Sequence, residues 1–192
     1  KRLYELYVEA HTPWEWHEEL FAHARERGLT PFSSPFDRTA VELLESLEVE
    51  LYKIASLEIG DLELLRDVAR TGKPIVISNG AATMRDVALA LETIREIGDN
   101  PITLLACTSS YPASASESNL RSIPTLRDAF GVSVGLSDHT LGIGAAVAAV
   151  VFGATLIEKH VTLDREDGGV DSAFSLDGAE LAALVRETRT AW

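Results

Sequence analysis

Short apolar runs alternate with longer amphipathic segments along this chain. Six runs have the composition of buried β-strands: 29–36, 51–56, 74–80, 102–110, 132–140 and 155–163. Segments with apolar residues at helical spacing separate them, including 37–48, 61–72, 83–98 and 119–131. The strand starts recur every 22 to 30 residues, which is the length of a βα unit, so the pattern predicts a parallel sheet.

A further helix is predicted before the first strand, over residues 12–28. Thr12 is placed as its N-cap, Pro13 at its first position and Gly28 at its end.

Polar residues gather at the carboxyl end of nearly every predicted strand. They are Ser33, Ser34, Lys53, Ser56, Ser78, Asn79, Thr108 to Ser110, Ser137 to His139, Lys159 and His160. All strand ends meet on one face in a (β/α)8 barrel, whereas in an open sheet they spread along an edge. The pattern therefore favours an α/β fold of the (β/α)8 TIM-barrel type. Because six units do not close eight strands, either two βα units are lacking or the sheet is open.

Composition narrows the classes of partner. The chain has 192 residues and a net charge of −13, which argues against binding to nucleic acid or to an anionic membrane. No run is long and apolar enough to span a bilayer. Cys107 is the single cysteine, so an internal disulfide is excluded and a cytoplasmic location is the simplest expectation. Its position inside a strand predicts an inert core thiol.

His139 and His160 are the first candidates for chemistry. They end consecutive predicted strands, so a parallel sheet would place the two imidazoles side by side, where they suit a transition metal such as Mn, Fe, Co or Zn. Asp138, Glu158 and Asp171 are nearby carboxylates that would complete or orient such a site. Ordinary hydrogen bonding of both histidines, and solvated or capping roles for the carboxylates, are the alternative interpretation.

Lys53 is the second candidate, because a lysine inside an apolar strand is costly to bury without a partner. It forms a structural salt bridge with Glu58 or Asp37, binds a substrate phosphate or carboxylate, or serves as a Schiff-base amine. Serines at successive strand ends would contribute hydrogen bonds to the same anion, although each alone is a plausible helix cap. These serines are Ser34, Ser56, Ser78, Ser109 and Ser137. Tyr111 either forms part of a pocket wall or belongs to a turn.

Several motifs resemble the sialic acid synthase family in order and spacing. They are "TPFSSPFD", "YKIASLE", "KPIVISNG", "LLACTSSYP", "VGLSDHT" and "IEKHVTLDR" followed by "GVDSAFSL". The resemblance covers essentially the whole chain. Within the family, "EAHTPWEWHEELF" and "VDSAFSL" look most like the pseudaminic acid synthases.

The resemblance implies a role for each matching residue. His139 and His160 would bind a divalent metal, Mn²⁺ first, with Mg²⁺ or Co²⁺ as alternatives. Glu58 and Asp171, with the two histidines, would be catalytic. The substrate-binding residues would be Ser34, Lys53, Ser56, Ser78, Ser109, Tyr111 and Ser137. Of these, Lys53 and four serines (Ser56, Ser78, Ser109 and Ser137) would hold the phosphate of phosphoenolpyruvate. Ser34 would lie near its carboxylate, while Glu58, Tyr111 and Asp171 would face the sugar.

The implied activity joins phosphoenolpyruvate to an amino-sugar aldehyde, with release of phosphate by C–O cleavage. The alternatives are legionaminic acid or N-acetylneuraminate synthesis, or an inactive fragment that serves as a binding or folding module. Residues 1–192 are expected to form one partial barrel domain, without the family's first two βα units and C-terminal antifreeze-like domain. The full-length protein would be a homodimer.

Overall fold

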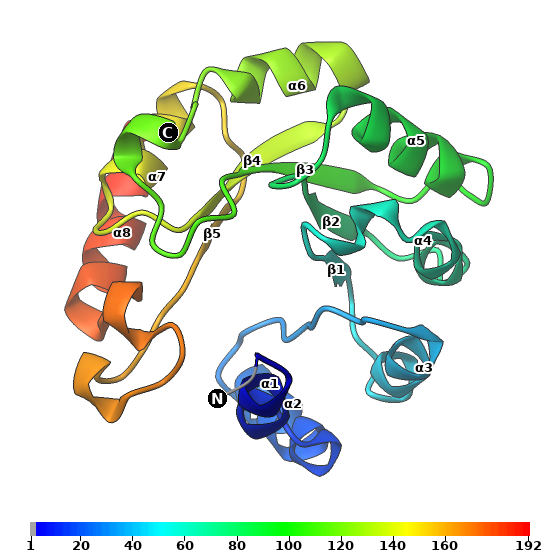
Figure 1. Ribbon diagram of the computed structural model, residues 1–192, viewed down its shortest axis with the longest axis horizontal. Helices are drawn as coiled ribbons and strands as arrows, with labels where there is room; N and C mark the ends of the chain where they lie inside the picture. The colour runs from blue at the N-terminus through cyan, green and yellow to red at the C-terminus, as the bar shows by residue number, and fades with distance from the viewer. Residues whose placement is uncertain (1–2) are drawn as a thin grey trace.

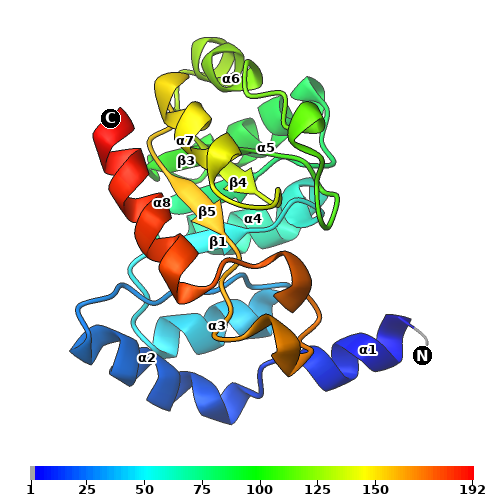
Figure 2. The same cartoon turned by 90° about the vertical axis from the view of Figure 1, so that its left-hand side faces the viewer.

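The computed structural model describes residues 3–192 and contains a parallel sheet with helices outside it (Figure 1). The strands are β1 (Tyr52–Ile54), β2 (Ile75–Ser78), β3 (Ile102–Cys107), β4 (Ser133–Asp138) and β5 (Ile157–Lys159). They pair in chain order, each parallel to the next. The sheet curls into a half-barrel, and we call its inner side the concave face and its helix-covered side the convex face (Figure 2).

Helices follow the strands as expected for βα units. The α-helices are α1 (Leu3–Ala10), α2 (His17–Glu26), α3 (Arg38–Ser46), α4 (Leu62–Ala69), α5 (Met84–Arg95), α6 (Ser122–Phe130), α7 (Gly144–Val151) and α8 (Gly178–Ala191). Short 3-10 helices cover Trp14–Trp16, Glu58–Gly60, Ala115–Glu117, Arg165–Asp167 and Ser172–Phe174.

Local sequence accounts for several helix starts. The side chains of Asp37 and Asp61 accept hydrogen bonds from the free amides of the first turns of α3 and α4. Thr83 and Asp177 begin α5 and α8 with reciprocal capping boxes. Gly131 ends α6 at a φ of 63°, a left-handed conformation that glycine adopts without strain.

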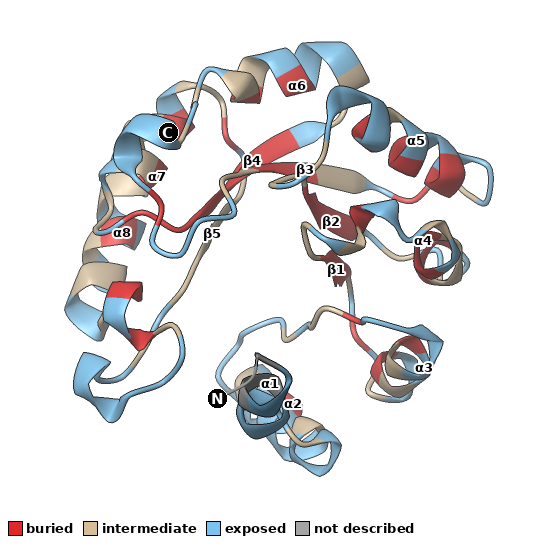
Figure 3. Cartoon of the chain, in the orientation of Figure 1, coloured by how far each residue is buried: buried red, intermediate tan, exposed pale blue. Residues whose placement is uncertain are grey.

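The strand register separates the two faces of the sheet. Lys53 pairs with Val76, Val76 with Thr103, Thr103 with Ser133, and Ser137 with Glu158. Because side chains alternate along a strand, these residues and those two positions further on share the concave face. The intervening apolar residues, including Ile54, Ile77 and Leu104, are buried in the main core beneath the helices (Figure 3).

The structure contradicts two of the secondary-structure predictions. Residues 29–36 are not a strand, although the Lys53 amide donates to the Ser33 carbonyl at 3.4 Å. Pro31 and Pro35 lack amide donors, which weakens any ladder there. The predicted N-cap at Thr12 is also wrong, since the chain begins a 3-10 turn after Pro13 and only then enters α2.

The predicted α/β class is confirmed by this half-barrel of parallel strands. Among residues 3–192, we find no helix with the length and apolar character that crossing a membrane requires.

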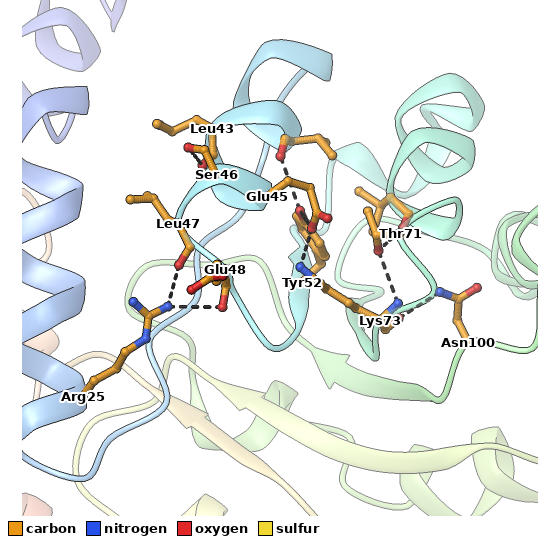
Figure 4. Close-up of polar contacts among 12 residues, drawn as sticks. Arg25, Leu43, Glu45, Ser46, Leu47, Glu48, Tyr52, Thr71, Lys73 and Asn100 are labelled. Carbon is orange, nitrogen blue, oxygen red and sulfur yellow. Dashed lines mark hydrogen bonds and ion pairs between the residues drawn. The ribbon is translucent and has the colours of Figure 1, made fainter.

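A polar network joins the amino ends of the first strands (Figure 4). The Tyr52 hydroxyl donates to Glu45 Oε1 at 2.8 Å, and Lys73 Nζ donates to the same oxygen at 2.5 Å. Asn100 Nδ2 donates to the Lys73 carbonyl at 2.8 Å. Burial and the Glu45 contact both raise the pKa of Tyr52. The network ties α3 to the starts of β1, β2 and β3, at the end of the sheet opposite the polar strand ends.

Gly135 marks a close approach between β4 and the chain entering β5. A Cβ atom at this position would overlap the Leu156 carbonyl oxygen and would lie 2.7 Å from Leu105 Cδ2. Because backbone cannot rotate aside, we expect Gly135→Ala to lower the free energy of unfolding by about 1–3 kcal/mol in urea titrations. Gly60→Ala is the matched control, since a Cβ there meets nothing within 4 Å. Equal stabilities of the two variants would contradict the prediction.

Candidate active site

The carboxyl ends of β1 to β5 bring polar side chains from five strands onto the concave face. Lys53, Ser78, Cys107, Ser137 and Glu158 share this face by strand register. His139 and His160 continue the same alternation just beyond β4 and β5. The predicted convergence of polar strand ends is therefore present, with the addition of Cys107.

The two histidines lie side by side, as expected. Their ring centroids are 5.2 Å apart, and the Tyr111 ring lies 4.3 Å from that of His139. His139 Nδ1 is 3.0 Å from the Thr108 carbonyl oxygen, so a proton on Nδ1 is donated there and the Nε2 lone pair remains for a ligand. Asp171 Oδ2 lies 3.4 Å from His160 Nδ1, so a carboxylate stands beside the second ring.

Burial and neighbours shift the pKa values of the two imidazoles in opposite directions. Burial lowers the pKa of His160 and outweighs the attraction of Asp171, so the neutral ring is favoured. Burial also lowers the pKa of His139, but the contacts with Cys107 and the Thr108 carbonyl outweigh it and raise this pKa.

Within residues 3–192, no three His, Cys, Asp or Glu side chains lie close enough together to hold a metal ion unaided. His139 and His160 would therefore supply two ligands, and further ones would have to come from water, substrate or other parts of the protein. The nitrogen chemistry of the pair suits a transition metal.

Lys53 pairs across the concave face with Glu158. Its Nζ lies 3.6 Å from Glu158 Oε2, and the Ser137 hydroxyl donates to Glu158 Oε1 at 2.6 Å. The sequence interpretation that paired Lys53 with Glu58 or Asp37 is wrong, because the curl of the sheet brings β1 opposite β5. Asp37 instead caps α3.

Ser78, Asn100 and Ser118 each have a buried side-chain atom without a hydrogen-bond partner among the described residues, and of these Ser78 lies on the concave face. Ser78 is 2% exposed, and the unpartnered atom is its Oγ. An orphaned buried hydroxyl is costly unless something else binds it. Ser78 and Lys53 share the concave face, so an anion bound by Lys53 is the natural partner.

Gly80 provides room for three more side chains. A Cβ there would overlap Ser109 Oγ and would lie 2.8 Å from Cys107 Sγ and 2.9 Å from Ser56 Oγ. The Gly80 amide donates to Ser56 Oγ at 3.1 Å. The bare glycine thus lets three strand ends converge.

Cys107 is not the inert core residue expected from its strand. It is half-buried, and its Sγ lies 3.5 Å from Ser56 Oγ and 4.0 Å from His139 Nδ1. Burial raises the pKa of the thiol, but the neighbouring side chains of His139, Ser56 and Ser137 outweigh this and lower it. The in-register pairing of Cys107 with Ser137, which shows that it faces the site, is not visible in the sequence.

Asp138 faces away from the site. It lies on the convex face with Leu136, and its carboxylate binds Lys159 Nζ at 2.7 Å. Of the three nearby carboxylates considered in the sequence, Glu158 and Asp171 face the histidine site and Asp138 does not.

An open cleft of about 1340 Å³ lies above these strand ends. Five of the sequence-predicted residues line it: Ser56, Glu58, Ser109, Tyr111 and Asp171. Its other lining residues are Glu9, Ala10, His11, Phe36, Ala55, Leu57, Gly168, Gly169 and Val170. Ser34 is half-buried and is not among the described residues that line the cleft. His11, which directly follows α1, also lines the cleft.

These features define a polar site at the carboxyl end of a curled parallel sheet. The sequence profile of the NeuB family matches residues 1–192, and the chain belongs to this family. The resemblance seen in the motifs is thereby confirmed.

Two named groups of relatives stand out. The chain is 49% identical over 177 residues to pseudaminic acid synthase of Helicobacter pylori, covering 92% of the chain and 52% of that protein. It is 42% identical over 175 residues to N,N'-diacetyllegionaminic acid synthase of Campylobacter jejuni, covering 90% and 52%. The chain spans about half the length of the curated relatives it matches.

Solved structures agree with the fold. The N-acetylneuraminic acid synthetase of Leptospira borgpetersenii, solved with citrate, superposes with a TM-score of 0.94 at 34% identity, covering 97% of this chain and 65% of that one. A DAHP synthase of Thermotoga maritima superposes with a TM-score of 0.80 at 18% identity, covering 94% and 58%, and shows the fold alone.

The environment of Cys107 predicts how fast it is alkylated. With metal chelated, we expect His139→Phe to move the midpoint of the pH–rate profile for iodoacetamide at Cys107 to higher pH, because the thiolate loses a stabilising partner. Mass spectrometry of the Cys107 peptide measures the rate. His160→Phe is the control and should leave the midpoint in place, and an equal shift in both variants would contradict the assignment.

Proposed function

We propose that the protein containing this chain condenses phosphoenolpyruvate with an acylated amino-sugar aldehyde to form a nine-carbon sugar acid, as a pseudaminic acid synthase. The observation that carries this proposal is the orphaned Ser78 hydroxyl on the same face as the buried Lys53. A phosphate group would satisfy both. The family membership and the names of the relatives support the same reaction class.

The phosphate would be held by residues from four strand ends: Lys53, Ser56, Ser78, Ser109 and Ser137. Lys53 now pairs with Glu158, so a bound phosphate would compete with that carboxylate for the ammonium group. Ser34 is proposed to contact the carboxylate of phosphoenolpyruvate. Such contacts would fix the orientation of C3 toward the sugar, and this orientation would contribute to the rate of a two-substrate condensation.

The sugar would occupy the open cleft beside Glu58, Tyr111 and Asp171, all of which line it. Glu58 would take or give the proton when water adds to the former enol carbon and phosphate leaves. Asp171 keeps His160 in place through its carboxylate. Tyr111 packs on His139 and would form part of the cleft wall.

His139 and His160 are proposed to hold a divalent metal, Mn²⁺ in the first instance, with Mg²⁺ or Co²⁺ as alternatives. When bound, the cation would act as a Lewis acid on the sugar carbonyl. Each ring would contribute one nitrogen donor. The Thr108 carbonyl, which contacts His139, and the Asp171 carboxylate, which lies beside His160, would help to orient the two rings.

We also propose that this half-barrel belongs to an eight-stranded barrel domain. Its eight positions would be the five strands, the segment 29–36 whose Ser33 carbonyl contacts the Lys53 amide, and two further βα units. The whole protein would act as a cytoplasmic homodimer, without nucleic-acid or membrane partners. The support is the five-strand curl, the superposition on a synthetase chain, and the net charge of −13.

A sibling activity on the legionaminic or N-acetylneuraminic sugar is the second candidate, favoured by the 42% identity to the legionaminic enzyme. Phosphate release by the full-length protein, measured with phosphoenolpyruvate, Mn²⁺ and each of the three amino sugars, separates the candidates. The sugar with the highest kcat/KM identifies the activity. Absence of release with every sugar contradicts the synthase proposal and leaves the binding-module alternative.

Lys53→Met tests the phosphate site. Loss of a charge-assisted contact to phosphate should lower kcat/KM for phosphoenolpyruvate by about 10- to 100-fold, measured by phosphate release. Lys73→Met, at the opposite end of the sheet, is the control, and it should change stability rather than the KM for phosphoenolpyruvate. A Lys53→Met enzyme with the parental KM and kcat would exclude Lys53 from the phosphate site.

A further inference from the structure

A buried ion pair lies on the convex face, directly behind the two histidines. Lys159 Nζ donates to Asp138 Oδ2 at 2.7 Å and to the Thr140 carbonyl at 2.5 Å. The two charged side chains are 4% and 1% exposed. Neither residue reaches the concave face, so the pair takes no direct part in the proposed chemistry.

The ion pair holds the chain on both sides of His139. Asp138 Oδ1 accepts from the Thr140 amide at 2.9 Å and from the Thr140 hydroxyl at 2.8 Å, which closes a tight turn around His139. Lys159 binds both ends of that turn and is itself the residue before His160. One ammonium group therefore connects the backbone segments that carry the two imidazoles.

The sheet itself stops short of the histidines. The ladder between β4 and β5 ends with the Asp138–Lys159 pair. Beyond it, the two segments bind different partners: the His139 carbonyl accepts from the Ala113 amide and the His160 carbonyl from the Leu176 amide, each at 2.9 Å. Without a direct link, the two segments would be free to move apart at the point where the imidazoles emerge.

Burial of this pair is poorly explained by stability alone. Burying two charges costs hydration free energy, and their mutual attraction barely offsets this cost. Apolar residues of similar volume often stabilise a core equally well. Lys159 shares its face of β5 with Ile157, which packs against the small cluster of Ala146, Leu176 and Leu184 under α7 and α8. An apolar residue would fit this setting. What an apolar residue lacks is the pair of directional contacts with Asp138 Oδ2 and the Thr140 carbonyl.

We propose that Lys159 is a positioning residue, which with Asp138 sets the separation of His139 and His160 required to bind one divalent cation jointly. The observed 5.2 Å between ring centroids is the geometry that it maintains. The expected effect of Lys159 on metal binding rests on the proposed metal site, whereas its expected effect on the separation of the two rings does not.

The decisive variant is D138N/K159M in the full-length protein, because it removes the tie without leaving a buried charge unpaired. The amide oxygen of the introduced asparagine can still accept from Thr140, so the turn itself is preserved. The control is E45Q/K73M, which removes a more exposed Lys–carboxylate pair at the amino end of the sheet, far from the histidines (Figure 4). Electron paramagnetic resonance of Mn²⁺ without substrates gives the dissociation constant, urea unfolding gives stability, and crystal structures of the metal-free variants give the ring separation.

We expect Mn²⁺ to bind D138N/K159M about 10- to 100-fold more weakly than the parent, the loss typical of residues that orient metal ligands. The His139–His160 separation should change in this variant and remain 5.2 Å in the control, which should also bind Mn²⁺ like the parent. Unchanged ring separation and unchanged Mn²⁺ affinity in D138N/K159M would overturn the inference, as would equal weakening in E45Q/K73M.

Failure of the proposed function has a different signature. If the parent protein releases no phosphate and binds no Mn²⁺, the proposed synthase activity and the proposed metal site are both wrong. The Asp138–Lys159 pair then has no metal site to support. The ring separation in the metal-free variants still decides whether Lys159 positions the histidines.

Discussion

The in-register parallel pairing of five short strands is the constraint on which the rest of this structure depends. Neighbouring residues in a parallel ladder point to the same side, so one alternation of apolar and polar positions defines both faces at once. Ile54, Ile77 and Leu104 fall on the helix-covered side. Lys53, Ser78 and Ser137 fall on the opposite side. A slip of one residue in any strand would exchange a core residue for a site residue.

Curling of the sheet adds a second level of organisation. The first and last strands, which are its edges, face each other closely enough for Lys53 to reach Glu158. The two ends of the strands also differ in character. The amino end carries a network in which Glu45 accepts from both Tyr52 and Lys73. The carboxyl end carries the polar side chains of Lys53, Ser78 and Ser137 on the concave face.

Much of the fold follows from the sequence because its signals are local. Asp37, Asp61 and Thr83 mark helix starts, and five of the six apolar runs contain strands at the expected positions. The remaining run fails because prolines remove its donors, a cost that apolar composition conceals. The site is only partly readable from the sequence because its geometry is not local. Strand order predicts that His139 and His160 are neighbours, but the meeting of Lys53 with Glu158 depends on how far the sheet curls.

The cleft is built from two kinds of structure, strand ends and loops. Its floor comes from strand ends, whose positions are fixed by the ladder and the core. Its rim comes from the end of α1 and from loops, through His11, Phe36, Leu57 and Val170. Phe36, Leu57 and Val170 are exposed, so exchanging them disturbs little packing. Such a division lets the rim residues be exchanged with little effect on the strand ends below them, which the ladder and the core hold in place.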